Sequence, residues 1–209
     1  MRIAVVSESS ADEAAVKILV DAIVGSETEI VALRTRPNGW PHVLNLLPNI
    51  VIRLHYGTDV EGLVVVVDSD ESPVHENLHE QEQAENPECR LCLLRVALRS
   101  ALAKVNPLPN RRAMKTALGL AVPAIEAWYR CGLDPHVTEF EWVRKLQGEI
   151  LTYDKRSLKI SAYGSDPSSN FHRTEVGKQA ALRLATNLEQ LEQRFPNGFG
   201  ALLRDLQHW

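Results

Sequence analysis

The chain has few cysteines, no long apolar run and no excess of positive charge, and each of these features excludes a class of protein. Three cysteines among 209 residues are too few, and odd in number, for the disulfide framework of a secreted domain. No apolar run approaches the roughly 20 residues of a membrane span, and the N-terminus lacks the apolar core of a signal peptide. We therefore expect a cytoplasmic protein without a membrane partner.

The charge balance limits the partners further. The sequence has 27 acidic and 23 basic residues, a net charge of -4. This balance gives no general attraction to nucleic acid, so a phosphate partner needs a local basic patch or a bridging metal. The chain also lacks a G-x-x-x-x-G-K-[ST] loop, which excludes ATP hydrolysis by that route. Hydrophobic residues make up 44% of the chain, a proportion typical of a globular protein with a sizeable core.

The stretch GLVVVVDSD, residues 62–70, is the most informative in the chain. A continuous β-branched run bounded by glycine and acids predicts a strand buried on both faces of a parallel sheet. In open parallel sheets, ligands bind beyond the carboxyl ends of the strands, where Asp68 and Asp70 would lie. Both side chains can meet one ion only if the strand ends near Asp68 and the chain then turns. The alternative is a solvated turn, because Asp and Ser favour turns.

A second group of acids lies near the N-terminus, after another predicted strand. Residues 2–7 predict a buried strand that Glu8 follows, and Ser10 with Glu13 has the spacing of a helix capping box. The expected helix ends at Gly25 and carries Asp12 in its first turn. Acids favour a helix N-terminus, which explains Asp12 well but Glu8 poorly. The two carboxylates can converge on one point.

The remaining elements alternate between strands and helices. We expect strands over 29–33 and 114–122, and helices over 40–56, bent or broken near Pro48, and over 92–105. Pro123 should start a further helix, with Glu126 beside core residues as a metal-site or general-base candidate.

The C-terminal part is predicted to be helical over 138–151, 174–195 and 200–206, with a polar, irregular stretch at 153–173. This stretch is the most basic in the chain. It either approaches a phosphodiester backbone or forms a solvated loop. The substrate-binding candidates are Arg34, Lys155, Arg156 and Arg173.

Residues 71–88 are acidic and resemble an exposed insertion that precedes a C-x-x-C pair. His75 and His79 are four residues apart and would share a helix face. With Cys89 and Cys92 they complete a set of tetrahedral zinc ligands, whereas the alternative is a surface histidine pair followed by two helix-start cysteines. A redox role is disfavoured because no thioredoxin-like context surrounds the pair.

Alternating strands and helices predict a doubly wound, mostly parallel α/β sheet. Glu8 with Asp12, and Asp68-Ser69-Asp70 after LVVVV, resemble the Toprim fold of topoisomerases, bacterial primases and the overcoming-lysogenization-defect nucleases. The stretches VSESSADEAAVKILV, VVVVDSD, PAIEAWYRCG and FPNGFGALLRDL resemble a Toprim-like family of uncharacterised bacterial proteins. One departure is Ser9, where many Toprim proteins have glycine. The resemblance implies a core over 1–135, with a His/Cys insertion at about 71–92 and a helical extension over 136–209.

The resemblance also implies Mg²⁺- or Mn²⁺-dependent cleavage of phosphodiester bonds in DNA or RNA, as in an effector of bacterial anti-phage defence or a toxin-like system. The implied catalytic acids are Glu8, Asp68, Asp70 and Glu126, and the implied Mg²⁺ ligands are Glu8, Asp12, Asp68 and Asp70. Such an ion neutralises charge developing on the phosphate. A basic residue between 155 and 173 would stabilise the transition state.

Other functions remain open. A DxD after an apolar strand also occurs in haloacid-dehalogenase phosphatases and phosphotransferases, although there it usually ends the first strand, and in glycosyltransferases. A third alternative is a non-catalytic binding subunit that works beside an ATPase partner.

Overall fold

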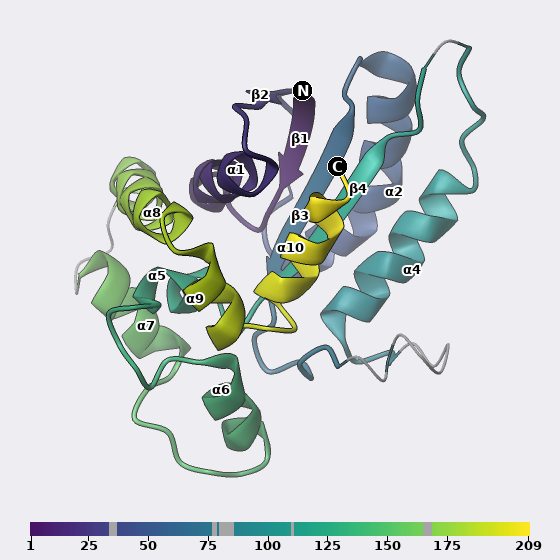
Figure 1. Cartoon of the computed structure of the whole chain (residues 1–209). Coiled ribbons are helices and arrows are strands. Elements are labelled where there is room, and N and C mark those ends of the chain that lie inside the picture. The colour runs from purple at the N-terminus through teal and green to yellow at the C-terminus, as the bar shows by residue number, and fades with distance from the viewer. Residues whose placement is uncertain (34–36, 77–78, 80–85, 110, 165–168) are drawn as a thin grey trace.

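The fold was analysed in a computed structural model that describes residues 1–33, 37–76, 79, 86–109, 111–164 and 169–209. Strands and helices alternate through the first two thirds of the chain, and helices alone form the rest (Figure 1). In chain order the elements are β1 (Arg2–Val6), α1 (Ser10–Val24), β2 (Glu29–Ile30), α2 (Trp40–Gly57), β3 (Gly62–Asp68), α4 (Arg90–Leu102), β4 (Lys115–Ala121), α5 (Ile125–Arg130), α6 (Glu139–Leu146), α7 (Lys155–Tyr163), α8 (Asn170–Ala185), α9 (Leu188–Arg194) and α10 (Phe199–Gln207).

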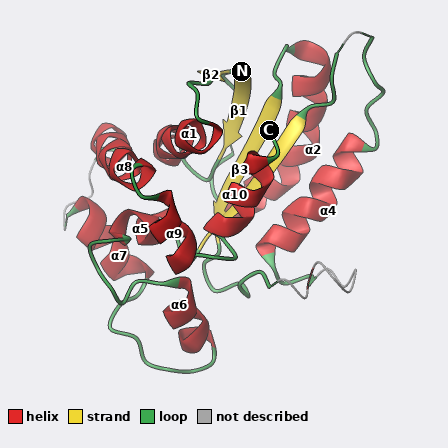
Figure 2. Cartoon of the chain, viewed as in Figure 1, coloured by secondary structure: helices red, strands yellow, loops and turns green. Residues whose placement is uncertain are grey.

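The four strands form one sheet in the order β2-β1-β3-β4, and all pairs are parallel (Figure 2). The chain moves outward from β1 to β2 and then returns to place β3 on the other side of β1. The order of strands therefore reverses between β1 and β3. Ligands of open α/β sheets bind at such a switch point, beyond the carboxyl ends of the strands.

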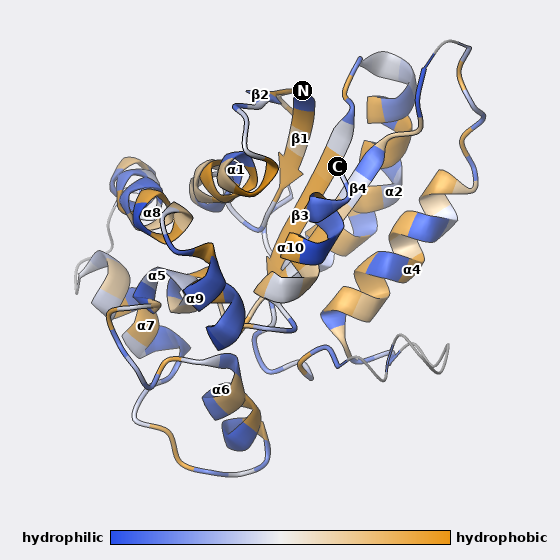
Figure 3. Cartoon of the chain, viewed as in Figure 1, coloured by the Kyte–Doolittle hydropathy of each residue, from blue (hydrophilic) through white to orange (hydrophobic). Residues whose placement is uncertain are grey.

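Helices cover both faces of the sheet, which confirms the predicted α/β class. Alternate residues of each central strand face opposite layers, as the period of an extended chain requires. One layer packs α1, α5, α8 and α10 on the side of Val64 and Val66, and the other packs α2 and α4 on the side of Val65 and Val67. The central strands β1 and β3 are mostly apolar, whereas β4 begins with hydrophilic residues and α9 is largely hydrophilic (Figure 3).

Several predicted elements need correction, and the helix expected to start at Pro123 begins only at Ile125. The second strand is confined to Glu29–Ile30, both exposed, because this edge position offers only β1 as a partner. Helix α2 runs unbroken through Pro48, because the apolar residues around it pack against the sheet. The predicted helix over 174–195 is two helices, α8 and α9, because the Asn187 side chain accepts a hydrogen bond from the Gln190 backbone and starts a new helix.

The stretch 153–173 is not irregular as predicted, since it contains α7 and the start of α8. Asp154 caps α7 by accepting a hydrogen bond from the Ser157 backbone, while the Ser157 hydroxyl accepts one from the Asp154 backbone. This capping box satisfies two backbone donors and fixes where the helix begins. It places Lys155 at the first helical position.

The C-terminal helices pack directly on the α/β core, where α8 lies against α1 and α10 lies against β4. Residues 71–89 form the connection from β3 to α4, and Val74, His75 and Cys89 in it are buried. Whether this connection is an insertion, and where the domain boundary falls, remain predictions. Within the described residues, no helix combines the length and apolar character needed to cross a membrane.

Candidate functional site

Two acids from neighbouring strands meet at the switch point. Glu8 follows β1 and Asp68 is the last residue of β3, which pairs with β1. The Asp68 backbone N–H donates to Glu8 Oε1 at 3.0 Å. These two acids, both candidate metal ligands, therefore lie at the same edge of the sheet.

The chain turns immediately after Asp68, as the sequence argument requires. The backbone N–H groups of Ser69 and Asp70 donate to carbonyls of Ala121 and Pro123, which extend the pairing with the β4 segment. Asp70 then adopts a left-handed conformation with φ of 49°, an uncommon geometry for a residue other than glycine. This turn brings the carboxylates of Asp68 and Asp70 toward the same partner.

That partner is Lys155, the first residue of α7. Its ammonium lies 2.8 Å from Asp68 Oδ2 and also pairs with Asp70 Oδ1. Asp68 Oδ1 accepts a further hydrogen bond from the Ile125 backbone at 3.0 Å. Lys155 thus joins the two aspartates from a helix that is remote in sequence.

Arg90, the first residue of α4, is a second cation at this edge. Its Nη2 lies 2.7 Å from Asp70 Oδ2, and its Nη1 donates to the Asp68 carbonyl at 2.7 Å and lies 3.6 Å from Glu8 Oε1. The guanidinium also stacks over the Trp40 ring, 5.0 Å from its centroid. Sequence analysis missed Arg90, and its only local signal is its position directly after Cys89.

The electrostatics of this edge reflect its crowded acids. Burial, and then the charge of Asp68, raise the pKa values of Glu8 and Asp12 to about 7. Burial also raises the pKa of Asp68 against the opposing effect of Lys155. The pKa of Asp70 is lowered, because Lys155 and Arg90 outweigh the effect of burial. Proton exchange near neutral pH is therefore available at Glu8 and Asp12.

Glu126 on α5 belongs to the same cluster. It is 5% exposed, and burial and Asp68 raise its pKa. Its Oε2 has no hydrogen-bond partner among the described residues. The neighbouring phenols of Tyr129 and Tyr163 also have raised pKa values, because of burial and then the nearby acids. This side of the edge therefore contains several buried acidic and phenolic groups.

These pKa values predict how stability depends on pH. Because folding raises the Asp12 pKa from 3.8 to about 7, the folded protein binds more protons than the unfolded chain between these values. Without divalent cations, the free energy of unfolding should fall from pH 5 to pH 8. Asp12→Asn should reduce this fall by roughly 1–3 kcal/mol, measured by urea denaturation at both pH values. An unchanged pH dependence in the variant would contradict the assigned shift.

Among the predicted substrate-binding residues, Lys155 contacts the acids. Arg156 is exposed on α7, and Arg173 on α8 lies over the Tyr163 ring at 5.8 Å. Arg34 lies outside the described residues. Substrate binding by Arg34, Arg156 and Arg173 stays a prediction.

A second cluster lies beside the acids, between the β3–α4 connection and α4. His75 Nδ1 is 3.6 Å from Cys89 Sγ and 3.5 Å from Cys92 Sγ, and His79 Nδ1 is 3.6 Å from Cys92 Sγ. One donor atom from each of the four residues lies within 4.8 Å of the others. In a tetrahedral zinc site with ordinary bond lengths, adjacent nitrogen and sulfur ligands are about 3.5 Å apart. The four predicted ligands are thus brought together, and this cluster could hold a metal ion.

The protonation of this cluster depends on what occupies it. Burial raises the pKa of the Cys89 thiol to about 12, so deprotonation at neutral pH requires a cation. Arg95 Nη1 lies 3.1 Å from His75 Nε2, so that nitrogen accepts a hydrogen bond in this arrangement. Coordination through Nδ1 would move the ring proton to Nε2 and require Arg95 to turn away.

The acids at the edge of the sheet do not form so compact a set of ligand atoms. Among the described residues, the His/Cys cluster is the only group of three or more potential ligands that meets this distance criterion. At the acidic edge, Lys155 lies against both aspartates. An ion that binds Asp68 and Asp70 would therefore have to displace the Lys155 ammonium.

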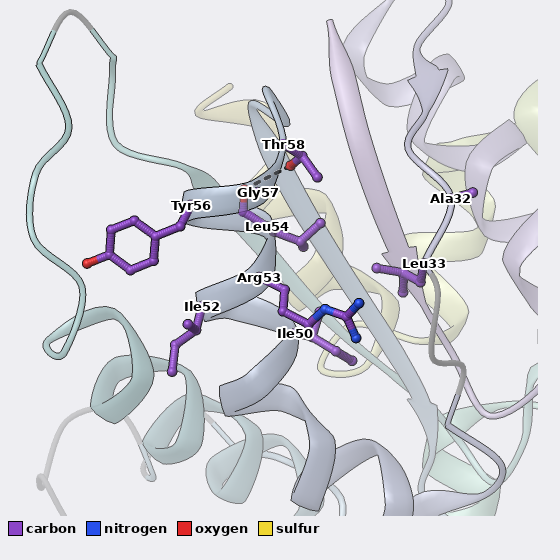
Figure 4. A pocket seen from close by; sticks show the side chains of 9 residues that line it. All are labelled: Ala32, Leu33, Ile50, Ile52, Arg53, Leu54, Tyr56, Gly57 and Thr58. Atoms are coloured by element: carbon purple, nitrogen blue, oxygen red, sulfur yellow. Dashed lines mark hydrogen bonds between the residues drawn. The ribbon is translucent and has the colours of Figure 1, made fainter.

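A surface pocket of about 580 Å³ lies between α2 and the segment after β2 (Figure 4). Ile50, Leu54 and Leu33 contribute apolar walls, and the Thr58 hydroxyl donates to the Leu54 carbonyl within α2. None of the nine lining residues belongs to the acidic or the His/Cys cluster. The pocket is thus separate from both candidate sites.

Comparison of the chain with protein-family models, curated proteins and solved structures finds no match. The Toprim resemblance is therefore neither supported nor contradicted by these comparisons.

Proposed function

We propose that this protein is a divalent-metal-dependent hydrolase of phosphodiester bonds in nucleic acid, with a Toprim-like arrangement of its acids. The observation that carries the proposal is the meeting of Glu8, Asp68 and Asp70 at the switch point of a parallel sheet. Carboxylate oxygens are the ligands that Mg²⁺ and Mn²⁺ prefer. The ion pairs with Lys155 support the fit of a cation between the two aspartates.

Asp68, Asp70 and Glu8 would hold the ion, and Asp12 and Glu126 extend the acidic surface around it. The ion would neutralise charge on the phosphate and lower the pKa of a bound water. Lys155 and Arg90, both at this edge, would bind the phosphate oxygens. Where Glu8 is not a ligand of the ion, its carboxylate would instead accept a proton from the attacking water.

For the His75/His79/Cys89/Cys92 cluster we propose zinc as the ion. Two imidazoles and two thiols are a typical ligand set for structural zinc, and four protein ligands leave no open position for substrate. Three of the four are nearly inaccessible, with exposed fractions of 2% or less for His75, Cys89 and Cys92. This role is structural rather than catalytic.

A second candidate function is a non-catalytic binding subunit, one whose partner would be an ATPase. It is favoured by Lys155, which already neutralises the two aspartates that would bind a catalytic ion. In such a subunit the Lys155 ion pairs would persist on binding, and no divalent ion would enter.

The deciding experiment is incubation of the purified protein with Mg²⁺, Mn²⁺ or EDTA and a panel of single- and double-stranded DNA and RNA. We expect metal-dependent cleavage of at least one substrate class and none in EDTA. Binding of nucleic acid without cleavage under every metal condition would favour the binding subunit instead.

A further inference from the structure

The two clusters share the first turn of α4. Cys89 is the N-cap residue of this helix, Arg90 is its first residue, and Cys92 follows two positions later. The Arg90 side chain reaches Asp68, Asp70 and Glu8, while the thiols on either side of it in sequence face the histidines. One helical turn therefore carries half of the His/Cys cluster and the arginine of the acidic edge.

The histidines of the His/Cys cluster lie in the connection that follows β3, shortly after the aspartates. His75 is five residues beyond Asp70 in the same connection and is 1% exposed. An ion bound by His75, Cys89 and Cys92 would cross-link the chain after β3 to the start of α4. This cross-link would join two residues 14 positions apart and so reduce the conformational entropy of the unfolded chain.

The start of α4 is packed in the core through Leu91 and Leu94, but its N-terminus lacks stabilisation by side chains. The Cys89 side chain makes no capping hydrogen bond, and the first turn contains no acidic residue. Both features normally stabilise a helix N-terminus, where four backbone N–H groups lack partners within the helix. The geometry of Arg90 therefore depends on the contacts of its neighbours in this turn.

We infer that an ion at the His/Cys cluster is a clamp that holds Arg90 on the carboxylates of Asp68 and Asp70. Occupancy of the structural site then controls the acidic edge, because Arg90 leaves the aspartates when the first turn of α4 loosens. Arg90 is a phosphate-binding group, and the four ligands act through it as positioning residues. The positioning of Arg90 is inferred from its own contacts. Only the expected effect on substrate rests on the proposed function.

The test compares His79→Ala with His136→Ala in the full chain. His79 is only half-buried, so its replacement should leave the core folded, and His136 is an exposed histidine outside the cluster. Zinc content would be measured by elemental analysis, and backbone opening by hydrogen exchange. We expect one zinc per wild-type chain and at least tenfold less in His79→Ala. Exchange should be at least tenfold faster at 89–95 and also at 68–72, with no change in His136→Ala.

Arg90→Met tests whether the effect of zinc on exchange at residues 68–72 depends on Arg90. In this background, loss of zinc should still speed exchange at 89–95 but should no longer affect 68–72. Where cleavage is measurable, His79→Ala should raise KM at least fivefold in the wild-type background and leave it unchanged in the Arg90→Met background. A protein that merely loses stability would show faster exchange throughout β4 and α10 as well.

Two results would overturn the inference: a wild-type chain that retains no zinc, or zinc loss that leaves exchange at 68–72 unchanged. If zinc loss speeds exchange at 68–72 but no variant cleaves any substrate, the clamp stands and the proposed hydrolase activity fails.

Discussion

Asp68→Asn should lower metal-dependent cleavage at least 10³-fold while leaving the protein folded. Asp68 lies at the end of a buried strand, where its two oxygens contact the Ile125 backbone N–H and Lys155. Asparagine keeps the shape and one carbonyl oxygen, but it removes the charge that binds the ion and positions Lys155. The loss of a group that acts in the transition state typically costs several kcal/mol.

The measurement is a single-turnover cleavage rate with Mn²⁺ and the substrate identified in the panel. Asp59→Asn is the matched control, because Asp59 is an exposed aspartate that pairs with Arg2 on the surface. It should cleave like the wild type. Cleavage by Asp68→Asn within tenfold of the wild type would remove Asp68 from the catalytic group.

Lys155→Met should change metal binding and cleavage in opposite directions. The ammonium lies against both aspartates, so a divalent ion must displace it. Without it, Mn²⁺ affinity should rise about tenfold, equivalent to about 1.4 kcal/mol. Cleavage at saturating Mn²⁺ should nevertheless fall at least 10²-fold, because the variant lacks the cation that binds phosphate.

Calorimetric titration with Mn²⁺ and cleavage at saturating metal would measure both effects. Lys155→Arg keeps the charge at the same position and should not gain affinity for Mn²⁺. If Lys155→Met changes neither quantity, the lysine is only a surface partner of the aspartates. A loss of thermal stability that Mn²⁺ restores is expected, since the variant leaves two carboxylates without this partner.

The sequence predicted the parts of the site that local pattern encodes. The valine run identified β3, and Glu8 and Asp68 were singled out because each follows a buried strand. The parallel pairing of β1 and β3 places both at one edge. The spacing of His75, His79, Cys89 and Cys92 likewise predicted the cluster that the structure assembles.

The parts that sequence analysis missed are long-range contacts. Lys155 was expected to bind substrate, but nothing in its surroundings indicates that it pairs with two aspartates, of which Asp70 is 85 residues away. Its helix α7 was missed because charged residues masked a short apolar face and the Asp154 capping box was not recognised. Arg90 has no motif of its own, so its contacts with Asp68 and Asp70 emerge only when the fold brings the start of α4 to the end of β3.

Binding of Mn²⁺ at the acidic edge tests the central claim most directly. Electron paramagnetic resonance of free Mn²⁺, titrated with the protein and with Asp68→Asn, would count the bound ions. The His/Cys cluster would be kept saturated with zinc throughout. We predict at least one Mn²⁺ per wild-type chain with a Kd below 1 mM, a site that Asp68→Asn loses and Asp59→Asn retains. If the wild-type chain binds no Mn²⁺, or if Asp68→Asn binds it equally well, the acidic edge is not a divalent-metal site.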